Sequence, residues 1–239
     1  MADYDPVAPF YDLVHGSRKQ TIKYIKQLIK DYHPKAKTLL SVACGTGTVC
    51  KALKRCYQIT GVDISSGMLA MAEKKLPTVE FYQQDMVELN LNKKFDVIIC
   101  LFASLNHVLQ FSQWEKFFAR VKDHLNAGGV FIVDILTELC LYNMVLNSPL
   151  ITRSGKLISI GDISMAGEGQ EGTVWRIKGY EVTRHDQRLL FASKVSQVSF
   201  APERIEKGLL NHFSSVIVED PEQEEVNERS ELLYFICSL

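Results

Sequence analysis

Residues 38–49 of the chain read TLLSVACGTGTV, and this stretch decides the fold. It begins with the apolar residues of a short strand and continues into a turn that contains Gly45 and Gly47. Glycine adopts backbone angles that other residues avoid, and it lets a ligand come close to the main chain. The first backbone N–H groups of the following helix have no partner inside the helix, so they favour a polar or negative ligand group. The stretch therefore predicts a strand, a ligand-binding turn and a helix.

Strands and helices alternate on both sides of this turn. Short apolar segments with the length of buried strands are separated by segments with a helical period. This alternation is typical of a parallel sheet with right-handed crossovers. The expected strands lie at residues 39–42, 58–64, 79–85, 95–101 and 130–135, and the expected helices lie between Ser17 and Pro34, at 49–55 and at 68–75.

One more helix is expected before the fifth strand. Ser112 and Glu115 have the spacing of a capping box, in which two side chains satisfy the free N–H groups at a helix start. Gly128 and Gly129 are expected to end this helix. Its aromatic residues recur at helical spacing and are expected to face the core.

The pattern changes after about residue 150. Three segments there are rich in β-forming residues without a helical period, which predicts an antiparallel insertion. A helix that starts at Pro202 and two final strands return to the main sheet, and the acidic link between these strands is typical of an antiparallel edge. The segments of the insertion are Leu157–Ser164, Thr173–Thr183 and Leu189–Phe200, and the final strands are Ser215–Val218 and Leu232–Cys237.

The composition weighs against several classes of protein. The net charge of −1 shows no basic surplus, which disfavours binding to nucleic acid or to a membrane surface. No apolar run has the length of a membrane span, and the start MADYDPVAPF does not resemble a signal peptide. The six cysteines show no C-x-x-C spacing, so we expect reduced thiols in a cytoplasmic protein rather than a metal site.

Three polar features follow successive strands. They are the glycine turn, Asp63 and Asp85, and ligands of doubly wound sheets bind beyond the carboxyl ends of the strands. A carboxylate at Asp63 can accept hydrogen bonds from both hydroxyls of a ribose, as it would in nicotinamide dinucleotides and in adenosyl cofactors. Each acid has an alternative interpretation without a ligand: Asp63 could be an acid that stabilises a helix N-terminus, and Asp85 could be a solvated loop residue.

The glycine turn discriminates between these two cofactors. A dinucleotide fingerprint has the pattern G-x-G-x-x-G, whose last position must be glycine or alanine. That position holds Cys50 when the pattern is counted from Gly45, and Thr48 when it is counted from Ala43. The sequence has Ala-x-Gly-x-Gly instead, starting at Ala43. Asp85 adds an acceptor suited to the amino group of adenine. The residues therefore favour an adenosyl cofactor over a dinucleotide.

The segments VACGTGT, GVDISSGML, QQDM, FDVIICLFASLNHV and GGVFIVDI, in this order, resemble the class I S-adenosylmethionine-dependent methyltransferases. With FYDLVHG near the start, the resemblance extends to small-molecule N-methyltransferases, including enzymes that dimethylate amino sugars. It implies an α/β fold with a Rossmann-like, doubly wound seven-stranded sheet, an antiparallel last strand and an antiparallel insertion between strands five and six. The implied single methyltransferase domain spans 1–239, with an N-terminal lid and helix at 1–35, a cofactor-binding core at 36–140, the insertion at 150–200 and the rest of the core at 201–239.

The resemblance also implies cofactor-binding residues. They would hold the methionine part, the ribose, the adenine and the sulfonium of S-adenosylmethionine. Two departures from the family pattern would weaken this binding, because Ser41 replaces a common acid and Ala43 replaces the first glycine. The implied residues are Tyr11, Arg18, Ala43, Cys44, Gly45 and Gly47 for the methionine part and its closure, Asp63 for the ribose, Ile64, Met68, Asp85 and Met86 for the adenine, and Leu101 and Phe102 for the sulfonium.

His107 and Tyr11 are the candidate catalytic residues. Methyl transfer from a sulfonium depends mainly on placing the nucleophile in line with the methyl group, and an amine must be neutral to react. His107 follows the fourth strand and is the candidate base or orienting group, and Tyr11 is the second candidate. Both residues equally fit a packing role.

The sequence thus predicts an enzyme that transfers a methyl group from S-adenosylmethionine to a small molecule, with an amine as the favoured acceptor and S-adenosylhomocysteine as the product. One alternative is a methyltransferase that acts on protein or RNA. Another is a non-catalytic cofactor-binding protein, for which Ser41 and Ala43 are the supporting features. The insertion is expected to roof the substrate pocket or to form a homodimer contact.

Overall fold

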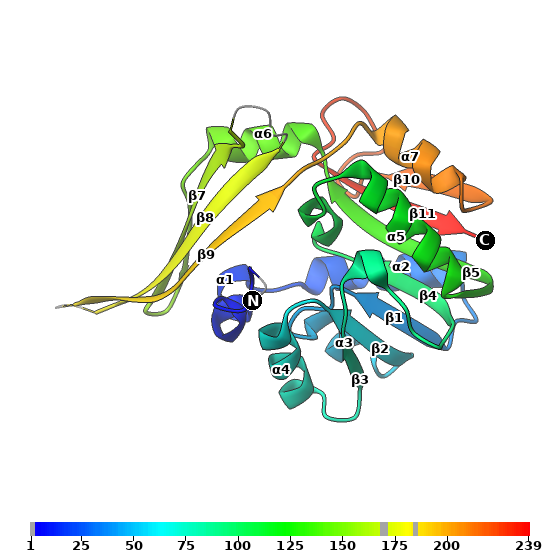
Figure 1. Ribbon diagram of the computed structural model, residues 1–239, viewed down its shortest axis with the longest axis horizontal. Helices are drawn as coiled ribbons and strands as arrows, with labels where there is room; N and C mark the ends of the chain where they lie inside the picture. The colour runs from blue at the N-terminus through cyan, green and yellow to red at the C-terminus, as the bar shows by residue number, and fades with distance from the viewer. Residues whose placement is uncertain (1–2, 168–171, 184–185) are drawn as a thin grey trace.

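The centre of the protein is a seven-stranded sheet in the order β10-β11-β5-β4-β1-β2-β3 (Figure 1). The computed structural model describes residues 3–167, 172–183 and 186–239. Strands β1 to β5 are parallel, whereas β11 runs antiparallel to both β5 and β10. This confirms the predicted doubly wound sheet with an antiparallel last strand. The strands are β1 (Thr38–Val42), β2 (Gln58–Asp63), β3 (Glu80–Gln83), β4 (Phe95–Cys100), β5 (Leu125–Leu136), β10 (Ser215–Glu219) and β11 (Leu232–Ser238).

Helices cover both faces of this sheet (Figure 1). On one face the core contains α5 and α7, and on the other it contains α2 and α3. The helices and short 3-10 turns of this part are α2 (Lys19–Tyr32), α3 (Thr48–Leu53), α4 (Ser66–Lys75), η2 (Met86–Glu88), η3 (Ser104–His107), α5 (Phe111–Asp123) and α7 (Pro202–Leu210).

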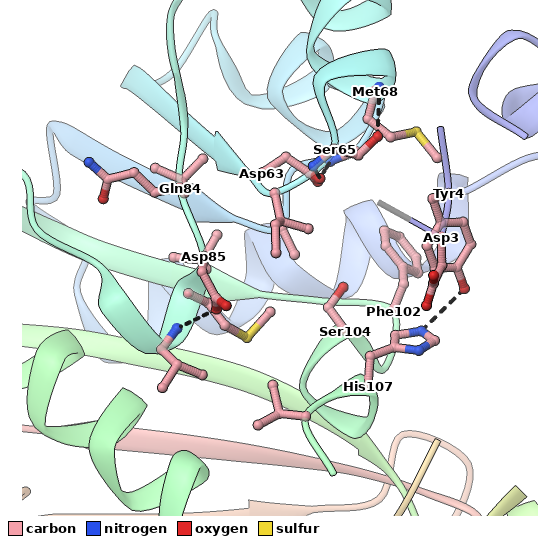
Figure 2. Close-up of a pocket in the computed structure, with 18 of the residues that line it drawn as sticks. Asp3, Tyr4, Asp63, Ser65, Met68, Gln84, Asp85, Phe102, Ser104 and His107 are labelled. Carbon is pink, nitrogen blue, oxygen red and sulfur yellow. Dashed lines mark hydrogen bonds between the residues drawn. The ribbon is translucent and has the colours of Figure 1, made fainter. Parts of the chain in front are cut away.

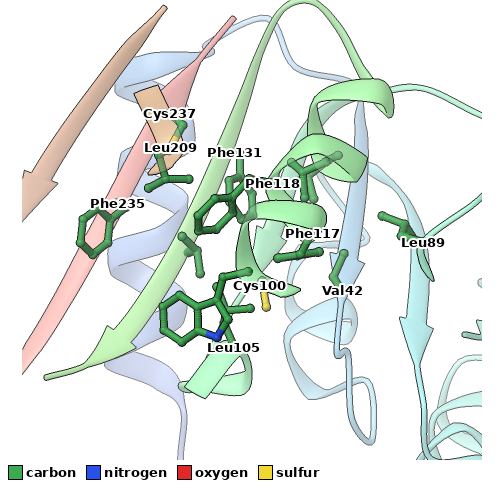
Figure 3. Close-up of a cluster of buried hydrophobic side chains, with 14 of the residues drawn as sticks. Val42, Leu89, Cys100, Leu105, Phe117, Phe118, Phe131, Leu209, Phe235 and Cys237 are labelled. Atoms are coloured by element: carbon green, nitrogen blue, oxygen red, sulfur yellow. The ribbon is translucent and has the colours of Figure 1, made fainter. Parts of the chain in front are cut away.

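Successive side chains of the central strands pack on opposite faces of the sheet. Phe131 of β5 packs with Phe117 and Phe118 of α5 (Figure 3), whereas the next residue, Ile132, belongs to the cluster on the opposite face. Successive side chains of a strand point to opposite faces, so a strand covered on both sides must be apolar throughout. This requirement explains the unbroken apolar runs that identified the strands.

Helix α5 and strand β5 differ from their predicted boundaries. The capping box was wrong, because α5 begins at Phe111 and its N-cap residue Gln110 makes no capping hydrogen bond through its side chain. The helix ends at Asp123, and Gly128 and Gly129 lie inside β5 rather than at a helix end. The pairing of β4 with β5 starts at Phe95 and Leu125 and shifts register before Val97, so the glycines lie in an irregular part of the strand.

The predicted antiparallel insertion is a separate sheet in the order β6-β7-β8-β9. The sequence prediction missed one edge strand of this sheet and the helix before it. The elements are α6 (Glu138–Leu146), β6 (Leu150–Ser154), β7 (Leu157–Met165), β8 (Thr173–Val182) and β9 (Gln187–Gln197). None of the helices in the described ranges is long and apolar enough to cross a membrane.

The N-terminal segment lies between the two sheets (Figure 1). It contains η1 (Ala8–Phe10) and α1 (Tyr11–His15). Val7 and Phe10 pack against the insertion, and the rings of Phe10 and Phe191 stack with their centroids 5.2 Å apart. The insertion therefore supports the segment from outside, and the segment faces the carboxyl ends of the central strands.

Candidate active site

A cavity of about 660 Å³ lies at the carboxyl ends of β1, β2 and β4 (Figure 2). One end is formed by the loops after β1, β2 and β3, and the other end by η3, the N-terminal segment and β9. We call these the cofactor end and the acceptor end, after the roles that the sequence analysis expects for their residues. The cofactor end contains Ala43, Gly45, Asp63, Ile64, Met68, Asp85 and Met86, and the acceptor end contains Asp3, Tyr4, Ser104, His107 and Ser196.

Asp63 joins two loops at the cofactor end. One carboxylate oxygen accepts a hydrogen bond of 2.7 Å from the backbone N–H of Gly45, and the other accepts one of 2.9 Å from the N–H of Ser65. Burial raises the pKa of Asp63, and these backbone donors act in the opposite direction. The carboxylate is therefore held at the cavity wall, where its other lone pairs can accept hydrogen bonds from hydroxyl groups.

The turn after β1 keeps its main chain open to the cavity. Gly45 has a φ of +55°, and a Cβ added there would meet no atom of the described residues within 4 Å. Gly47 has a φ of +74° and packs closely on α4, because an added Cβ would lie 3.2 Å from the Cβ of Ala72. Ala43 adopts a φ of +50°, so alanine occupies the left-handed position in which the family pattern has glycine.

Asp85 caps the short turn that follows β3. Its carboxylate accepts a hydrogen bond of 2.9 Å from the N–H of Val87. This bond fixes the side chain at the cavity (Figure 2), and the next residue, Met86, also lines the cavity. An acid and an apolar side chain thus stand together at the cofactor end, opposite the loop that carries Asp63.

The segment after β4 is held by a carboxylate that the sequence analysis missed. Phe102 and Ala103 have positive φ angles of 63° and 56°, and their N–H groups donate to the Asp134 carboxylate over 2.9 and 2.7 Å. Burial raises the pKa of Asp134 to about 6. The sequence offered one signal for this role: Asp134 is an acid within the apolar run GGVFIVDIL, and a buried charge needs specific hydrogen-bond partners.

Arg18 lies behind this segment. Its guanidinium carbon is 3.7 Å from the centroid of the Phe102 ring, and its side chain donates a hydrogen bond of 3.3 Å to the Tyr11 hydroxyl. Tyr11 and Phe102 line the cavity, and Arg18 does not. Arg18 therefore positions two aromatic residues of the wall.

His107 lies at the acceptor end in a defined tautomer. Its Nδ1 is 3.0 Å from the backbone carbonyl of Ser196, so Nδ1 carries the hydrogen and donates it. Burial lowers the pKa of His107, which keeps the ring neutral. Its Nε2 is then an acceptor, and the Tyr4 hydroxyl donates to it over 3.2 Å (Figure 2). Tyr4 was missed because the residues before FYDLVHG carry no readable motif.

Two acids fasten the N-terminal segment across the cavity. Asp5 accepts hydrogen bonds from the side chain of Ser65 and from the N–H of Gly67, at the start of α4. Asp12 accepts a hydrogen bond of 2.7 Å from Thr46 in the glycine turn and pairs with Lys75 of α4 at 2.8 Å. The segment is thus attached to the loops that carry Gly45 and Asp63.

Most of the predicted site residues meet at this cavity, and four do not line it. Gly47 is the N-cap residue of α3 and Leu101 is buried in the core, and neither lines the cavity. The thiol of Cys44 donates to the backbone carbonyl of Gly45 over 3.8 Å, and Cys44 does not line the cavity. Within the described ranges, no group of three or more His, Cys, Asp or Glu side chains is arranged to hold a metal ion. The predicted residues that line the cavity are Tyr11, Ala43, Gly45, Asp63, Ile64, Met68, Asp85, Met86, Phe102 and His107.

Comparison with known proteins connects this arrangement to a family. Residues 39–129 match the family model of a methyltransferase domain. The chain is 30% identical over 139 residues to dTDP-3-amino-3,6-dideoxy-alpha-D-glucopyranose N,N-dimethyltransferase of Streptomyces fradiae, a match that covers 56% of this chain and 54% of that protein. It is 33% identical over 132 residues to dTDP-3-amino-3,4,6-trideoxy-alpha-D-glucopyranose N,N-dimethyltransferase of Streptomyces venezuelae, covering 53% and 56%. The chain thus spans about half the length of the curated relatives that it matches.

Solved structures share the whole fold. An S-adenosylmethionine-dependent methyltransferase from Clostridium acetobutylicum superposes with a TM-score of 0.85 at 23% identity, covering 100% of this chain and 99% of that chain. DesVI of Streptomyces venezuelae superposes with a TM-score of 0.77 at 21% identity, covering 99% and 98%. The predicted resemblance is confirmed at the level of similarity: residues 39–129 match a methyltransferase domain model, and the chain has the fold of these solved methyltransferase structures.

Proposed function

We propose that the protein is an S-adenosylmethionine-dependent methyltransferase that acts on a small-molecule amine. The observation that carries the proposal is one cavity with two different ends. Asp63, Gly45 and Asp85 offer acceptors and open main chain at one end, and a neutral His107 offers a basic nitrogen at the other. The names of the two Streptomyces relatives, which are amino-sugar N,N-dimethyltransferases, support an amine acceptor.

The residues at the cofactor end fit S-adenosylmethionine. The Asp63 carboxylate is fixed by backbone donors and can accept from both ribose hydroxyls, and Asp85 can accept from the adenine amino group. The bare main chain at Gly45 leaves room for the methionine part. Arg18 does not line the cavity, and we propose that it meets the carboxylate of the cofactor only if its side chain turns past Tyr11 and Phe102 when the cofactor binds.

The remaining predicted residues have supporting roles in this proposal. Ile64, Met68 and Met86 supply apolar contacts to the adenine, and Phe102 closes the sulfonium end. Gly47, Cys44 and Leu101 act from behind the wall, through the close packing and fixed course of the two loops. Ala43 shows how the chain accommodates its departure from the family pattern, because it takes the left-handed angle in place of glycine.

The chemistry required of the protein is mainly placement and removal of a proton. The cofactor supplies a methyl group on a sulfonium, which is a good leaving group, so in-line orientation of the acceptor accounts for much of the acceleration. His107 Nε2 can accept a proton from the acceptor nitrogen, because Ser196 fixes the hydrogen on Nδ1. Tyr11 and Phe102 exclude water from the space between the two ends.

Calorimetric titration with S-adenosylhomocysteine tests the proposal directly. We expect micromolar binding to the wild type and its loss in Asp63→Ala, with circular dichroism to verify that the variant is folded. Release of S-adenosylhomocysteine from S-adenosylmethionine is then measured with a series of amines. A folded wild type that binds neither cofactor form would contradict the proposal. Activity that depends on an RNA or protein acceptor would replace the small-molecule acceptor.

We also propose the division of the chain given by the sequence, with a lid at 1–35, a core at 36–140 and 201–239, and the insertion at 150–200. A homodimer through the insertion would use its edge strands β6 and β9. Sedimentation equilibrium of the full chain tests this contact, and a monomer at high micromolar concentration would exclude it.

A further inference from the structure

All the charged side chains that line the cavity within the described ranges are acidic. They are Asp63 and Asp85 at the cofactor end and Asp3 at the acceptor end. Neither lysine nor arginine belongs to the described part of the lining. Two basic residues of the insertion, Arg176 and Lys194, lie opposite each other on β8 and β9 and are outside the cavity. The acceptor end is therefore negatively charged.

Asp3 is held in place by its neighbours. The Ser193 hydroxyl on β9 donates to the backbone carbonyl of Asp3. The next residue, Tyr4, donates to His107, and Asp5 is fastened to the start of α4. Figure 2 shows the Asp3 side chain beside Tyr4 and His107. The carboxylate therefore lies near His107, the residue that would accept a proton from the acceptor.

We propose that Asp3 makes the acceptor end selective for a small cationic amine that carries no phosphate group. The inference rests on the proposed function and specifies its acceptor. An ammonium is attracted by a carboxylate at short range, whereas a phosphate needs cationic donors such as arginine. The two Streptomyces relatives are named for dTDP-linked sugars, which carry a diphosphate. The described lining of this cavity has no lysine or arginine to meet such a diphosphate.

The same arrangement accounts for the proton. An amine that arrives as an ammonium must lose one N–H proton before its nitrogen can react. The N–H bond breaks, its electron pair stays on nitrogen, and the proton goes to Nε2 of His107. The Tyr4 hydroxyl and the Gln197 side-chain amide, which donate to Nε2 over 3.2 and 3.5 Å, have to move away first. The imidazolium that forms lies near the Asp3 carboxylate, whose charge favours it.

The experiment compares three probes of similar shape at pH 7: cyclohexylammonium, cyclohexanol and cyclohexanecarboxylate. Their dissociation constants are measured by ligand-observed NMR on the full chain, with and without saturating S-adenosylhomocysteine. The variants are Asp3→Asn, which removes the charge, and Asp3→Glu, which keeps it. Asp31→Asn is the matched control, because Asp31 is an exposed acid on α2 outside the cavity.

We expect the wild type to bind cyclohexylammonium more tightly than cyclohexanol, and cyclohexanol more tightly than the carboxylate. Because Asp3 is exposed, its removal should weaken ammonium binding by about fivefold. Asp3→Glu and Asp31→Asn should keep the preference. With any amine that turns over, Asp3→Asn should raise KM more than it lowers kcat, a split that general damage to the fold would not give.

Equal or undetectable binding of the three probes by the wild type would overturn the inference, as would an unchanged preference in Asp3→Asn. Faster methylation of a dTDP-linked amino sugar than of the same sugar without the nucleotide would also overturn it. Failure to bind S-adenosylhomocysteine would contradict only the proposed function, because the probe titrations without it still report on the acceptor end.

Discussion

The Asp134 carboxylate on β5 accepts a hydrogen bond of 2.7 Å from the backbone N–H of Ala103, in the segment that follows β4. The same carboxylate accepts from Phe102, and both residues have left-handed backbone angles. Two residues with side chains rarely adopt these angles in succession, so the two hydrogen bonds stabilise a strained segment. The position of Phe102 in the cavity wall thus depends on an acid that itself does not line the cavity.

Replacing this acid tests its structural role. Asp134→Ala leaves one buried and one partly buried N–H group without their acceptor, and we expect a loss of about 3 kcal/mol in the free energy of unfolding. Asp134→Asn is the control and should lose less, because its amide oxygen still accepts a hydrogen bond. Urea denaturation measures both variants. Wild-type stability in Asp134→Ala would show that the segment does not need the carboxylate.

The stability of the protein should also depend on pH through Asp134. Its pKa in the folded state is raised to about 6, so the folded state binds a proton more tightly than the unfolded state does. The stability that protonation of Asp134 contributes is therefore present at low pH and is lost as the pH rises through about 6. When the pH is lowered from 7 to 5, the free energy of unfolding of the wild type should rise by about 1 kcal/mol relative to that of Asp134→Asn. A constant difference across this range would contradict the raised pKa.

His107 should affect the reaction without affecting cofactor binding. If Nε2 accepts the proton of the acceptor, His107→Gln should lower kcat by about 100-fold and leave the affinity for S-adenosylhomocysteine unchanged. His107 must be unprotonated to accept a proton, so the wild-type kcat/KM should fall as the pH is lowered. Because burial lowers the pKa of His107, the apparent pKa of this fall should lie below the ordinary value for histidine. Steady-state rates from pH 5 to 8 check both points. Unchanged rates in His107→Gln would leave His107 a packing residue.

Alanine substitutions at two glycines distinguish the effect of backbone strain on stability from the effect of a side chain in the cavity on ligand binding. Gly45 and Gly128 have positive φ angles of +55° and +70°, and an added Cβ at either would meet no described atom within 4 Å. Alanine at each position should therefore cost a similar amount of stability, about 1 kcal/mol. Only Gly45→Ala should also weaken binding of S-adenosylhomocysteine, because Gly45 lines the cavity and Gly128 does not. Calorimetry on both variants decides this, and equal affinities would remove Gly45 from the cofactor site.

The parallel strands themselves, the glycine turn and the acids that follow β2 and β3 could be predicted from the sequence. The reason is that each depends on a local pattern. A strand covered on both faces must be apolar, and a turn that approaches a ligand needs glycine. The carboxyl ends of parallel strands share one edge of a sheet, so Asp63 and Asp85 could be placed near Gly45 without coordinates.

Boundaries set by neighbouring strands could not be predicted in this way. Gly128 and Gly129 were expected to end a helix, because glycine often does so. The pairing of Leu125 with Phe95 on β4 starts β5 before these glycines, and this contact depends on a strand about 30 residues earlier in the chain. Local propensity is a weak signal when a sheet supplies such a partner.

The sequence by itself determined the fold class, the resemblance to class I methyltransferases and most residues of the cofactor end. Only the tertiary structure decided the acceptor end. There Tyr4 donates to His107, Ser196 fixes its tautomer and Asp3 supplies the charge, although these residues come from three distant parts of the chain. Their side chains meet through the packing of the N-terminal segment between two sheets, and no local periodicity or turn chemistry encodes a contact of this kind.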